Sequence, residues 1–453
     1  MSNPNENILR QAKTLRESLP YLKYKELNNE EKFNAFYEPV SIARNDMEQD
    51  RTMKTALFIY AAVEPCHIIY SGHIGCGKST ELYRLSRMLK DEGYIVGIGD
   101  CYKNLDMKTV KYTDVILFIL ETLLKCADEN GIPVKKETLE NIEAYWDTVH
   151  TTVKENGFGS EISVNSAVEA RSPGILAKVF SIIISVRGLL RSNSDIRDEY
   201  RRVIEPKFSS FIEMVNDVID DIRTVREQRG FLRTIPVILL DQLEKADPDA
   251  SVELFEKHSQ ELTQLHLHLI IPFPIEMCYK PSYNQIKNFF EHEWILPMIK
   301  LRNWEEKTLS YAPYPIGKEV LRSVINKRMD EKLFAEGVLD NMIEKTGGFL
   351  RHLLDAVFEA GLNASVKGGI IIDETDMNVS LTNLQASITR MFPDSGIPRL
   401  EKIINGEKYY ASDEELMVFL RCGAVFEYNG KRWVDVHPLI FDWINETRAG
   451  RAE

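Results

Sequence analysis

Disulfide frameworks and zinc sites are excluded first, because this sequence of 453 residues has only six cysteines and no C-x-x-C pair. Scattered single cysteines are typical of reduced thiols in the cytosol. We therefore expect structural roles for Cys66, Cys76, Cys101, Cys126, Cys278 and Cys422.

Long hydrophobic runs are also missing. The most apolar stretch, GILAKVFSIIISV at 174–186, is too short to span a bilayer and carries Lys178. The first residues, MSNPNENILRQAK, have no apolar core of a signal peptide. We expect a cytoplasmic protein without a membrane partner.

Positive charge is in deficit, with 56 Lys and Arg against 69 Asp and Glu and a formal net charge of -13. An acidic surface repels phosphate backbones, so any nucleic-acid contact would need a local basic patch. The shares of 44% hydrophobic and 28% charged residues are ordinary for a globular protein. The length predicts several domains.

The stretch SGHIGCGKSTEL at 71–82 contains the most specific motif of the chain. It follows the apolar run CHIIY and precedes a segment with leucines at helical spacing, so it joins a strand to a helix. Glycines at this spacing, followed by lysine and a hydroxyl, form a loop whose N–H groups cradle phosphates. A glycine turn that only links two elements would not need the lysine and the hydroxyl. The predicted nucleotide-binding residues are Gly72, His73, Ile74, Gly75, Cys76, Gly77, Lys78, Ser79 and Thr80.

Within this loop, Lys78 is predicted to reach the β- and γ-phosphates and Ser79 to bind Mg²⁺. A second carboxylate for the metal is expected at the end of another buried strand. TIPVILLDQLEKAD at 234–247 offers Asp241 there, with the capping of a following turn as its alternative role. Many hydrolases place a glutamate directly after this aspartate, but here the neighbour is Gln242. Either Glu244 orients the attacking water, or Glu244 is a surface residue and hydrolysis is slow.

Further apolar runs predict the rest of the fold. Strands are expected within 94–100, within 266–274, where Pro272 and Pro274 halt the run, and within 293–301. Strands alternating with helical segments predict an α/β fold, a parallel sheet flanked by helices. Residues 315–391 show helical periodicity and predict a helical lid subdomain.

In that lid, the glycine pair of TGGFLRHLLDA is followed by Arg351 in the first turn of a helix. An arginine at a helix N-terminus is unfavourable for the helix dipole. A contact between Arg351 and nucleotide phosphates is therefore predicted, with an ordinary surface charge as the alternative.

GHIGCGKSTEL, LLDQLEK and TGGFLRHLLDA, in this order, resemble P-loop ATPases of the AAA+ and STAND type. Within that set the sequence is most similar to origin-recognition-like AAA+ proteins and to bacterial ATPases encoded in anti-phage defence loci. The resemblance implies ATP and Mg²⁺ as cofactors, Asp241 as the Walker B aspartate and Arg351 as a sensor-2-like arginine. It also implies that residues 1–50 form a helical, adenine-flanking segment in which Arg44 is the polar contact. The strand expected to end in a polar sensor-1 residue reads IIPFP instead.

The predicted ATPase core, 51–314, contains an insertion at about 101–230 that far exceeds a usual crossover. We expect a helix at 113–131, a hairpin strand at 160–170 and a long amphipathic helix at 196–225. The apolar run at 174–186 either packs against its own domain or docks a partner. A cluster of arginines beside it is either a solvated surface or the source of an arginine finger for a neighbouring protomer: Arg191, Arg197, Arg201 and Arg202.

The tail, 392–453, has helices followed by apolar alternations around Asn429-Gly430, the pattern of a tight hairpin. This order resembles the winged-helix domain that closes many of these ATPases. With 8 Lys and Arg against 11 Asp and Glu it is a poor phosphate-binding surface, which favours protein docking over DNA. His437 is expected to pack in the hairpin end, without a histidine or cysteine partner that would suit a metal.

These patterns together predict an ATP-binding, slowly hydrolysing switch that forms homo-oligomers or serves a companion effector protein. Three alternatives stay open. They are a DNA-binding initiator or loader, a small-molecule kinase, and a scaffold that holds ATP without turnover.

Overall fold

The computed structural model describes residues 9–24, 26–44, 55, 58–158, 174–192, 194–305, 310–406, 414–428 and 433–452. The predicted hairpin strand at 160–170 and the Asn429-Gly430 turn lie outside these ranges. Within the described ranges, no helix has the length and apolar character needed to cross a membrane. All six cysteines are free thiols, five of them buried.

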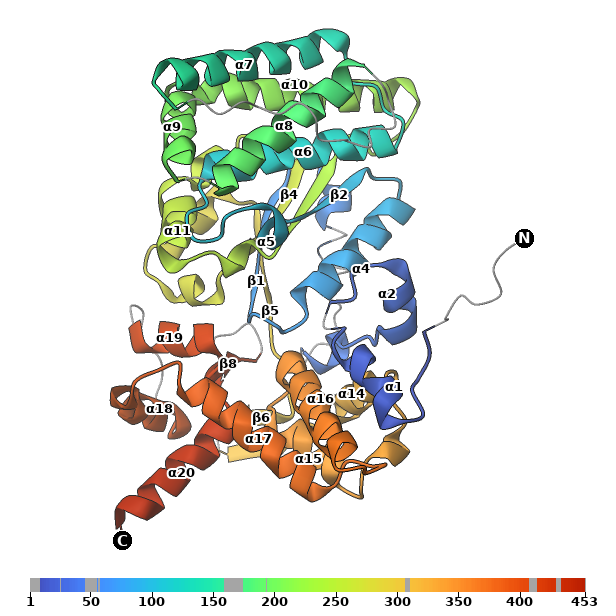
Figure 1. Ribbon diagram of the computed structural model, residues 1–453, viewed down its shortest axis with the longest axis vertical. Helices are drawn as coiled ribbons and strands as arrows, with labels where there is room; N and C mark the ends of the chain where they lie inside the picture. Colours follow the sequence, from blue (N-terminus) through green and yellow to red (C-terminus); the bar gives the residue numbers. More distant parts are fainter. Residues whose placement is uncertain are drawn as a thin grey trace, which may run out of the picture.

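A five-stranded, all-parallel sheet with the order β2-β3-β4-β1-β5 confirms the predicted α/β fold (Figure 1). Successive side chains of a strand point to opposite faces, so Ile69 joins one hydrophobic core and Ile68 and Tyr70 join the other. Burial on both faces explains why the strands read as unbroken apolar runs. The strands are β1 (His67–Gly72), β2 (Val96–Asp100), β3 (Val237–Asp241), β4 (His268–Phe273) and β5 (His292–Leu296).

Pro272 does not halt its strand, contrary to the prediction from sequence. It lies within β4 and stands opposite Tyr70 of β1. Along β4, the amides of every second residue, beginning with His268, point toward β3, and Pro272 occupies such a position. Pairing between β4 and β3 ends at Ile270, so no hydrogen bond to β3 is required at Pro272. The missing N–H of Pro272 therefore costs the sheet no hydrogen bond.

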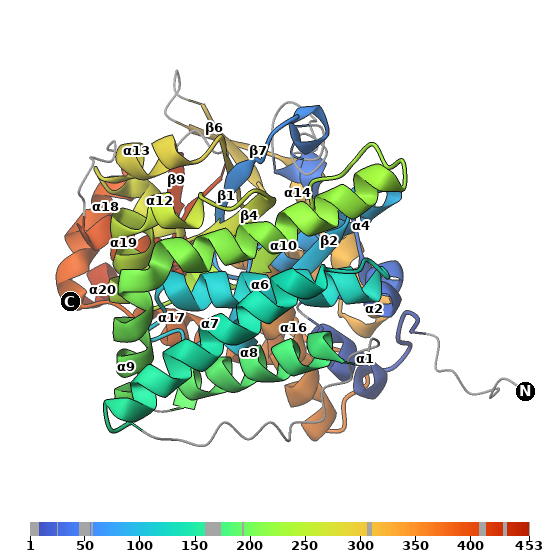
Figure 2. The same cartoon turned by 90° about the horizontal axis from the view of Figure 1, so that it is seen from above.

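Helices from the predicted insertion form a layer over one face of the sheet and beyond it (Figures 1 and 2). The helix α8 packs against α6, α7 and α9, and buries Val179, Ile183 and Val186. The apolar run at 174–186 thus packs within its own domain, which decides between the two readings. The helices are α5 (Cys101–Asn104), α6 (Tyr112–Glu129), α7 (Lys136–Glu155), α8 (Ile175–Ser192), α9 (Ser194–Ile204) and α10 (Phe208–Gln228).

One long helix at 196–225 was expected, but the structure has two. A 3-10 turn, η2 (Glu205–Lys207), separates α9 from α10. Pro206 has no N–H to continue the α-helical ladder, and it is well tolerated in a turn that starts a new helix.

The lid and the N-terminal segment share a hydrophobic core. The helix α1 (Leu15–Leu22) packs on α16 (Leu350–Val366), and Ala12 forms a β-bridge with Met329. The other elements of these regions are α2 (Glu30–Phe36), α14 (Pro315–Asn326), α15 (Val338–Lys345) and α17 (Glu374–Thr389). A ribbon that the sequence did not predict, β6 (Arg302–Glu305) with β7 (Ser310–Pro313), precedes the lid.

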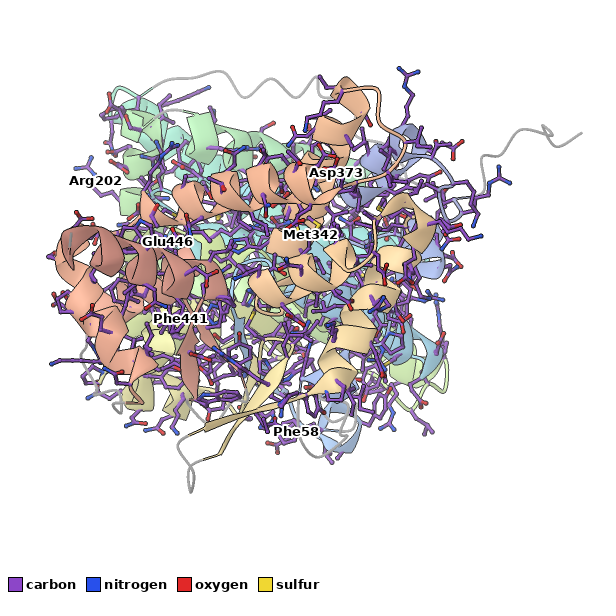
Figure 3. The ribbon with its side chains drawn as sticks, turned by 90° about the horizontal axis from the view of Figure 1, so that it is seen from below. Phe58, Arg202, Met342, Asp373, Phe441 and Glu446 are labelled. Carbon is purple, nitrogen blue, oxygen red and sulfur yellow. The ribbon has the colours of Figure 1, made fainter. Side chains whose placement is uncertain are left out.

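The C-terminal region has the predicted winged-helix-like order of helices and an antiparallel ribbon. It consists of α18 (Ile397–Ile404), α19 (Glu414–Cys422), β8 (Val425–Glu427), β9 (Val434–Val436) and α20 (Pro438–Ala452). From below, α20, with Phe441 and Glu446, lies beside the lid (Figure 3).

His437 is fully buried, as expected of a packing residue, but the prediction that no other histidine lies nearby was wrong. Its Nε2 lies 3.0 Å from Nδ1 of His352, and its Nδ1 accepts a hydrogen bond from the amide of Leu439. Burial lowers the pKa of His437 to about 3, so its ring is neutral. Because its Nδ1 accepts a hydrogen bond, Nε2 carries the hydrogen and donates it to Nδ1 of His352. Residue 352 lies in the lid helix α16, far away in sequence, and no local pattern could reveal the pair.

Candidate nucleotide-binding site

The loop between β1 and α4 (Lys78–Asp91) requires its glycines. Gly72, Gly75 and Gly77 all have positive φ, at 148°, 98° and 109°. A Cβ on Gly72 would come within 2.7 Å of the carbonyl oxygen of Leu296, and one on Gly75 within 2.7 Å of Nε of Arg351. The amides of the loop and of the first turn of α4 can therefore be approached closely by a ligand, as phosphate binding demands.

Lys78 lies buried at the start of α4, with its ammonium turned back toward the loop. Its Nζ donates hydrogen bonds to the carbonyls of Gly72 (2.7 Å) and His73 (3.0 Å), and lies 3.0 Å from Oε1 of Glu244. Burial is the largest single effect and lowers the pKa of Lys78, but the charge and hydrogen bond of Glu244, together with the charges of Cys76 and Asp241, raise the pKa above its usual value. The structure thus brings Glu244 to the loop, although it follows a different strand.

Ser79 and Asp241 meet across the ends of the sheet. The Ser79 hydroxyl donates a 2.9 Å hydrogen bond to Oδ1 of Asp241. Burial, and next the charge of Glu244, raise the pKa of Asp241 to about 7. A divalent cation beside this pair would offset both effects, and a hydroxyl with a carboxylate is a donor set that Mg²⁺ accepts. Oε2 of Glu244 is also buried, without a hydrogen-bond partner among the described residues.

Gln242, the residue that replaces the usual glutamate, is buried and has φ of 66°, the only positive φ among the described residues other than glycine. A left-handed backbone at a glutamine is strained, and such strain clusters at functional sites. Its Nε2 lies 3.5 Å from Oε2 of Glu26, and Nζ of Lys245 donates to its Oε1. Glu26 comes from the N-terminal segment, and no sequence pattern indicated a role for it at this site.

Arg351 lies at the loop, in the first turn of α16, with its side chain against Gly75. Arg44 is almost fully buried behind the same loop and donates hydrogen bonds to the carbonyls of Cys76 (2.6 Å) and Pro297 (2.5 Å). These bonds brace the loop, and contact between Arg44 and a base stays a prediction.

The remaining loop positions face different partners. Thr80 accepts a 3.3 Å hydrogen bond from the amide of Leu27, which fixes the N-terminal segment to α4. Cys76 is buried, whereas Ile74 is partly exposed. The imidazole of His73 turns away from the loop, so only its backbone remains available to a phosphate.

That imidazole joins the loop to the C-terminal domain. Nδ1 of His73 lies 3.2 Å from the carbonyl of Leu420, and Nε2 accepts a 2.9 Å hydrogen bond from the amide of Glu427. Burial and the charge of Lys78 lower the pKa of His73 to about 3, so the ring is neutral and Nδ1 carries the hydrogen. The sequence placed His73 in the loop but could not show this contact.

A single cleft borders both the loop and the lid. It encloses about 800 Å³ of space, part of which is open solvent at its mouth. The loop contributes Gly75 and residues 77–80 to the lining, and Glu244 and Arg351 contribute charged groups. Apolar and aromatic surface comes from Phe36, Tyr37, Val40, Val324, Leu350 and Leu354. The residues of the cleft that sequence reasoning missed are Glu26, Leu27, Phe36, Tyr37, Glu38, Val40, Glu81, Lys245, Val324, Arg328, Leu350 and Leu354.

The arginines considered for an arginine finger are bound within the insertion. Arg197 pairs with Asp106 at 2.8 Å, and Arg201 pairs with Asp114, where both side chains are buried. Arg202 pairs with Glu199, and Arg191 donates to the carbonyl of Lys103. For Arg197 and Arg201 the finger reading is wrong, because their guanidinium groups are enclosed by their own domain.

No protein-family model matches the chain, and no curated protein matches it significantly. Among solved structures it is similar to ORC2 of Aeropyrum pernix in complexes with ADPNP and ADP, with 11% identity and a TM-score of 0.40, over 92% of this chain and 98% of that one. It is also similar to Cdc6p of Pyrobaculum aerophilum, with 13% identity and a TM-score of 0.39, over 92% and 89% of the two chains. Similarity at this level does not establish an activity for this chain, whose function depends on the geometry of its own sheet and loop.

Proposed function

We propose that this chain is a P-loop ATPase of the AAA+ type that binds ATP and Mg²⁺ in the cleft and hydrolyses ATP slowly. The observation that carries the proposal is the convergence of Lys78, Ser79, Asp241 and Arg351 on one glycine loop from separate elements. A site for a triphosphate requires two cationic side chains and a pair of metal ligands beside the free amides at the start of a helix.

Each residue then has a defined task. Lys78 exchanges its bonds to the loop carbonyls for phosphate oxygens, and Arg351 adds a second positive charge from the lid. Asp241 and Ser79 would hold Mg²⁺, which would supply positive charge to the phosphates. Glu244, once released from Lys78, would orient the attacking water and accept its proton. Gln242 cannot take that proton, so the base comes from two residues further along the chain than in many hydrolases, and we expect turnover to be slower than theirs.

The same contacts suit a switch. Arg351 belongs to the lid, and His73 connects the loop to α19 and β8, so phosphates at the loop would bias both neighbouring domains. Two states with different exposed surfaces would let the chain assemble with itself or engage a companion effector. The resemblance to ATPases of bacterial anti-phage defence loci suggests such an effector as the client.

Product analysis with ATP labelled at the γ-phosphate tests the reaction type. The proposal expects slow release of free labelled phosphate by the wild-type chain and none by Lys78→Ala. Label on an organic acceptor would identify a small-molecule kinase instead. The absence of any transfer, with ATP still bound, would identify a scaffold.

A DNA-binding initiator or loader is the second candidate, supported by the winged-helix-like order of α18 to α20. In this arrangement, however, α19 lies against η5 (Ile275–Tyr279) of the core, and Arg421 pairs with Glu276 at 2.9 Å. Duplex binding through α19 would require this contact to open. A salt-dependent mobility shift of duplex DNA, lost on Lys431→Ala with Arg432→Ala, would favour this candidate; those two residues lie outside the described ranges.

A further inference from the structure

Arg328, just after α14, lines the cleft although only 3% of it is exposed. Its guanidinium lies over the ring of Phe36, 5.3 Å from the ring centre. It donates one good hydrogen bond, to the carbonyl of Val324 at 2.9 Å, and two long ones of 3.4 Å to Phe36 and Tyr24. Its Nε has no hydrogen-bond partner among the described residues.

The charge of Arg328 is not balanced by a carboxylate in the described parts of the chain. Burial lowers its pKa to about 10, and no charged group acts in the other direction. A buried cation is unfavourable unless acceptors surround it, and backbone carbonyls satisfy only part of a group with five N–H donors. Within the described residues, the guanidinium therefore keeps unused donor capacity in its Nε and its two long hydrogen bonds, on a residue that lines the cleft.

The position of Arg328 in the cleft indicates which part of a bound nucleotide would accept its hydrogen bond. Lys78 and Arg351 lie at the glycine loop, whereas Arg328 contacts Phe36 and Val324. Tyr37 and Leu354 add further aromatic and apolar surface to the cleft, which suits a flat ring, and Glu26 and Glu38 add carboxylates. Purine bases carry ring nitrogens that accept hydrogen bonds in the plane of the ring, and the planar guanidinium presents donors that fit such acceptors, as in the common pairing of arginine with N7 and O6 of guanine.

We propose that Arg328 selects purine nucleotides by donating a hydrogen bond to a ring nitrogen of the base. This inference rests on the proposed nucleotide binding of the cleft and adds the residue that reads the base. It assigns the two ends of the cleft to different parts of one ligand, so the ends can be tested separately.

Tripolyphosphate with Mg²⁺ probes the phosphate end alone, and ATP with Mg²⁺ probes both ends. Calorimetric titration of Arg328→Met is expected to show ATP affinity reduced about 10- to 100-fold, as for a lost bond to a charged donor, with tripolyphosphate affinity unchanged. Arg322→Met is the matched control on the outer side of α14, where Arg322 pairs with Glu331 and Asp340. It should change neither affinity.

A second measurement on the wild-type chain guards against a variant that fails to fold. Of the 1-deaza, 3-deaza and 7-deaza analogues of ATP, one should bind about tenfold more weakly than ATP or worse. On a folded Arg328→Met chain that difference should vanish. If all three analogues bind like ATP, or if Arg328→Met keeps full ATP affinity, the assignment of Arg328 is overturned while nucleotide binding stands. If the wild-type chain binds neither tripolyphosphate nor ATP, both proposals fall.

Discussion

At the scale of single residues, Glu244 is our candidate for the general base, because its Oε1 lies 3.0 Å from the ammonium of Lys78 in the phosphate-binding loop. We predict that Glu244→Gln slows phosphate release about 10²- to 10⁴-fold, the usual effect of removing a general base. ATP affinity should persist, because the amide keeps the shape of the side chain. Single-turnover phosphate release measures the effect.

Glu253→Gln, in the π-helical turn η4 (Glu253–Lys257), is the control and should hydrolyse ATP at the wild-type rate. An unchanged rate in Glu244→Gln would contradict the assignment. If Glu26→Gln alone stopped turnover, the water would be oriented by the N-terminal segment instead.

Asp241 gives a prediction about pH. Its pKa is raised from 3.8 in the unfolded chain to about 7 in the folded chain. The loss of folding free energy caused by ionised Asp241 is therefore complete above pH 7 and absent below pH 4. Asp241→Asn should therefore stabilise the protein without nucleotide by up to about 4 kcal/mol at pH 8 and by little at pH 4. Denaturant unfolding of both chains across this range measures the difference.

Asp91→Asn, at the exposed end of α4, should give no such trend. A gain in Asp241→Asn that did not grow with pH would contradict the burial of a charged Asp241.

At the residue scale, the sequence predicted what lies within one local motif. The spacing of Gly72, Gly77, Lys78 and Ser79 is a pattern of neighbouring residues, and so is Asp241 at the end of an apolar run. Glu26 and Arg328 reach the same cleft from segments 50 and 250 residues away from the loop along the chain. No local spacing encodes which distant segments converge, because that depends on how the domains pack.

At the scale of elements, the contact of the phosphate-binding loop with α19 and β8 depends on one imidazole. His73→Ala removes the hydrogen bonds of the ring to the carbonyl of Leu420 and from the amide of Glu427, at a cost of about 1–3 kcal/mol for each buried bond. We predict faster amide hydrogen exchange at 414–428 in this variant. Exchange followed by mass spectrometry measures it.

The stabilisation by His73 also depends on pH. The pKa of His73 is about 3 in the folded chain and 6.5 in the unfolded chain, so its contribution to the free energy of unfolding is complete above pH 6.5 and declines as the pH falls toward 3.

The control for the hydrogen-exchange measurement is His266→Ala, because the side chain of His266 is half exposed. Equal exchange at 414–428 in both variants would show that the loop and the C-terminal domain are not coupled through His73.

The sequence predicted element types better than element contacts. Apolar periodicity predicted α6 and the segment of α9 and α10, but not α7. It also left open whether 174–186 faces a partner or its own domain. Helical periodicity looks the same in both cases, since it records that one face is covered and not what covers it. Pro206 and Pro272 show the same limit, because the effect of a proline depends on whether a ladder bond is required at its position.

At the scale of the whole molecule, the lid, the sheet and the C-terminal domain all meet near one loop. Tyr428 of the C-terminal domain donates a 2.7 Å hydrogen bond to the carbonyl of Gly347 in the lid, and Tyr279 of the core donates one of 2.6 Å to Glu427. The order of these domains was readable from the sequence, but their mutual docking was not, because it depends on contacts between residues far apart in the chain.

If phosphates at the loop bias this docking, nucleotide should change assembly. We predict that a non-hydrolysable ATP analogue increases the mass of the protein in solution, and that Lys78→Ala abolishes the change. Light scattering after size-exclusion chromatography measures the mass. A monomer of constant mass in all conditions would show that nucleotide does not cause self-assembly. The nucleotide-dependent change would then have to act on a partner effector.

The most direct test of the central claim is calorimetric titration of the full chain with ATP and Mg²⁺. The account predicts saturable binding of one ATP per chain, and at least about a tenfold loss of affinity in Lys78→Ala, where the buried ammonium is gone. Wild-type protein that gives no binding heat at millimolar ATP, or a Lys78→Ala chain that binds equally well, would contradict it.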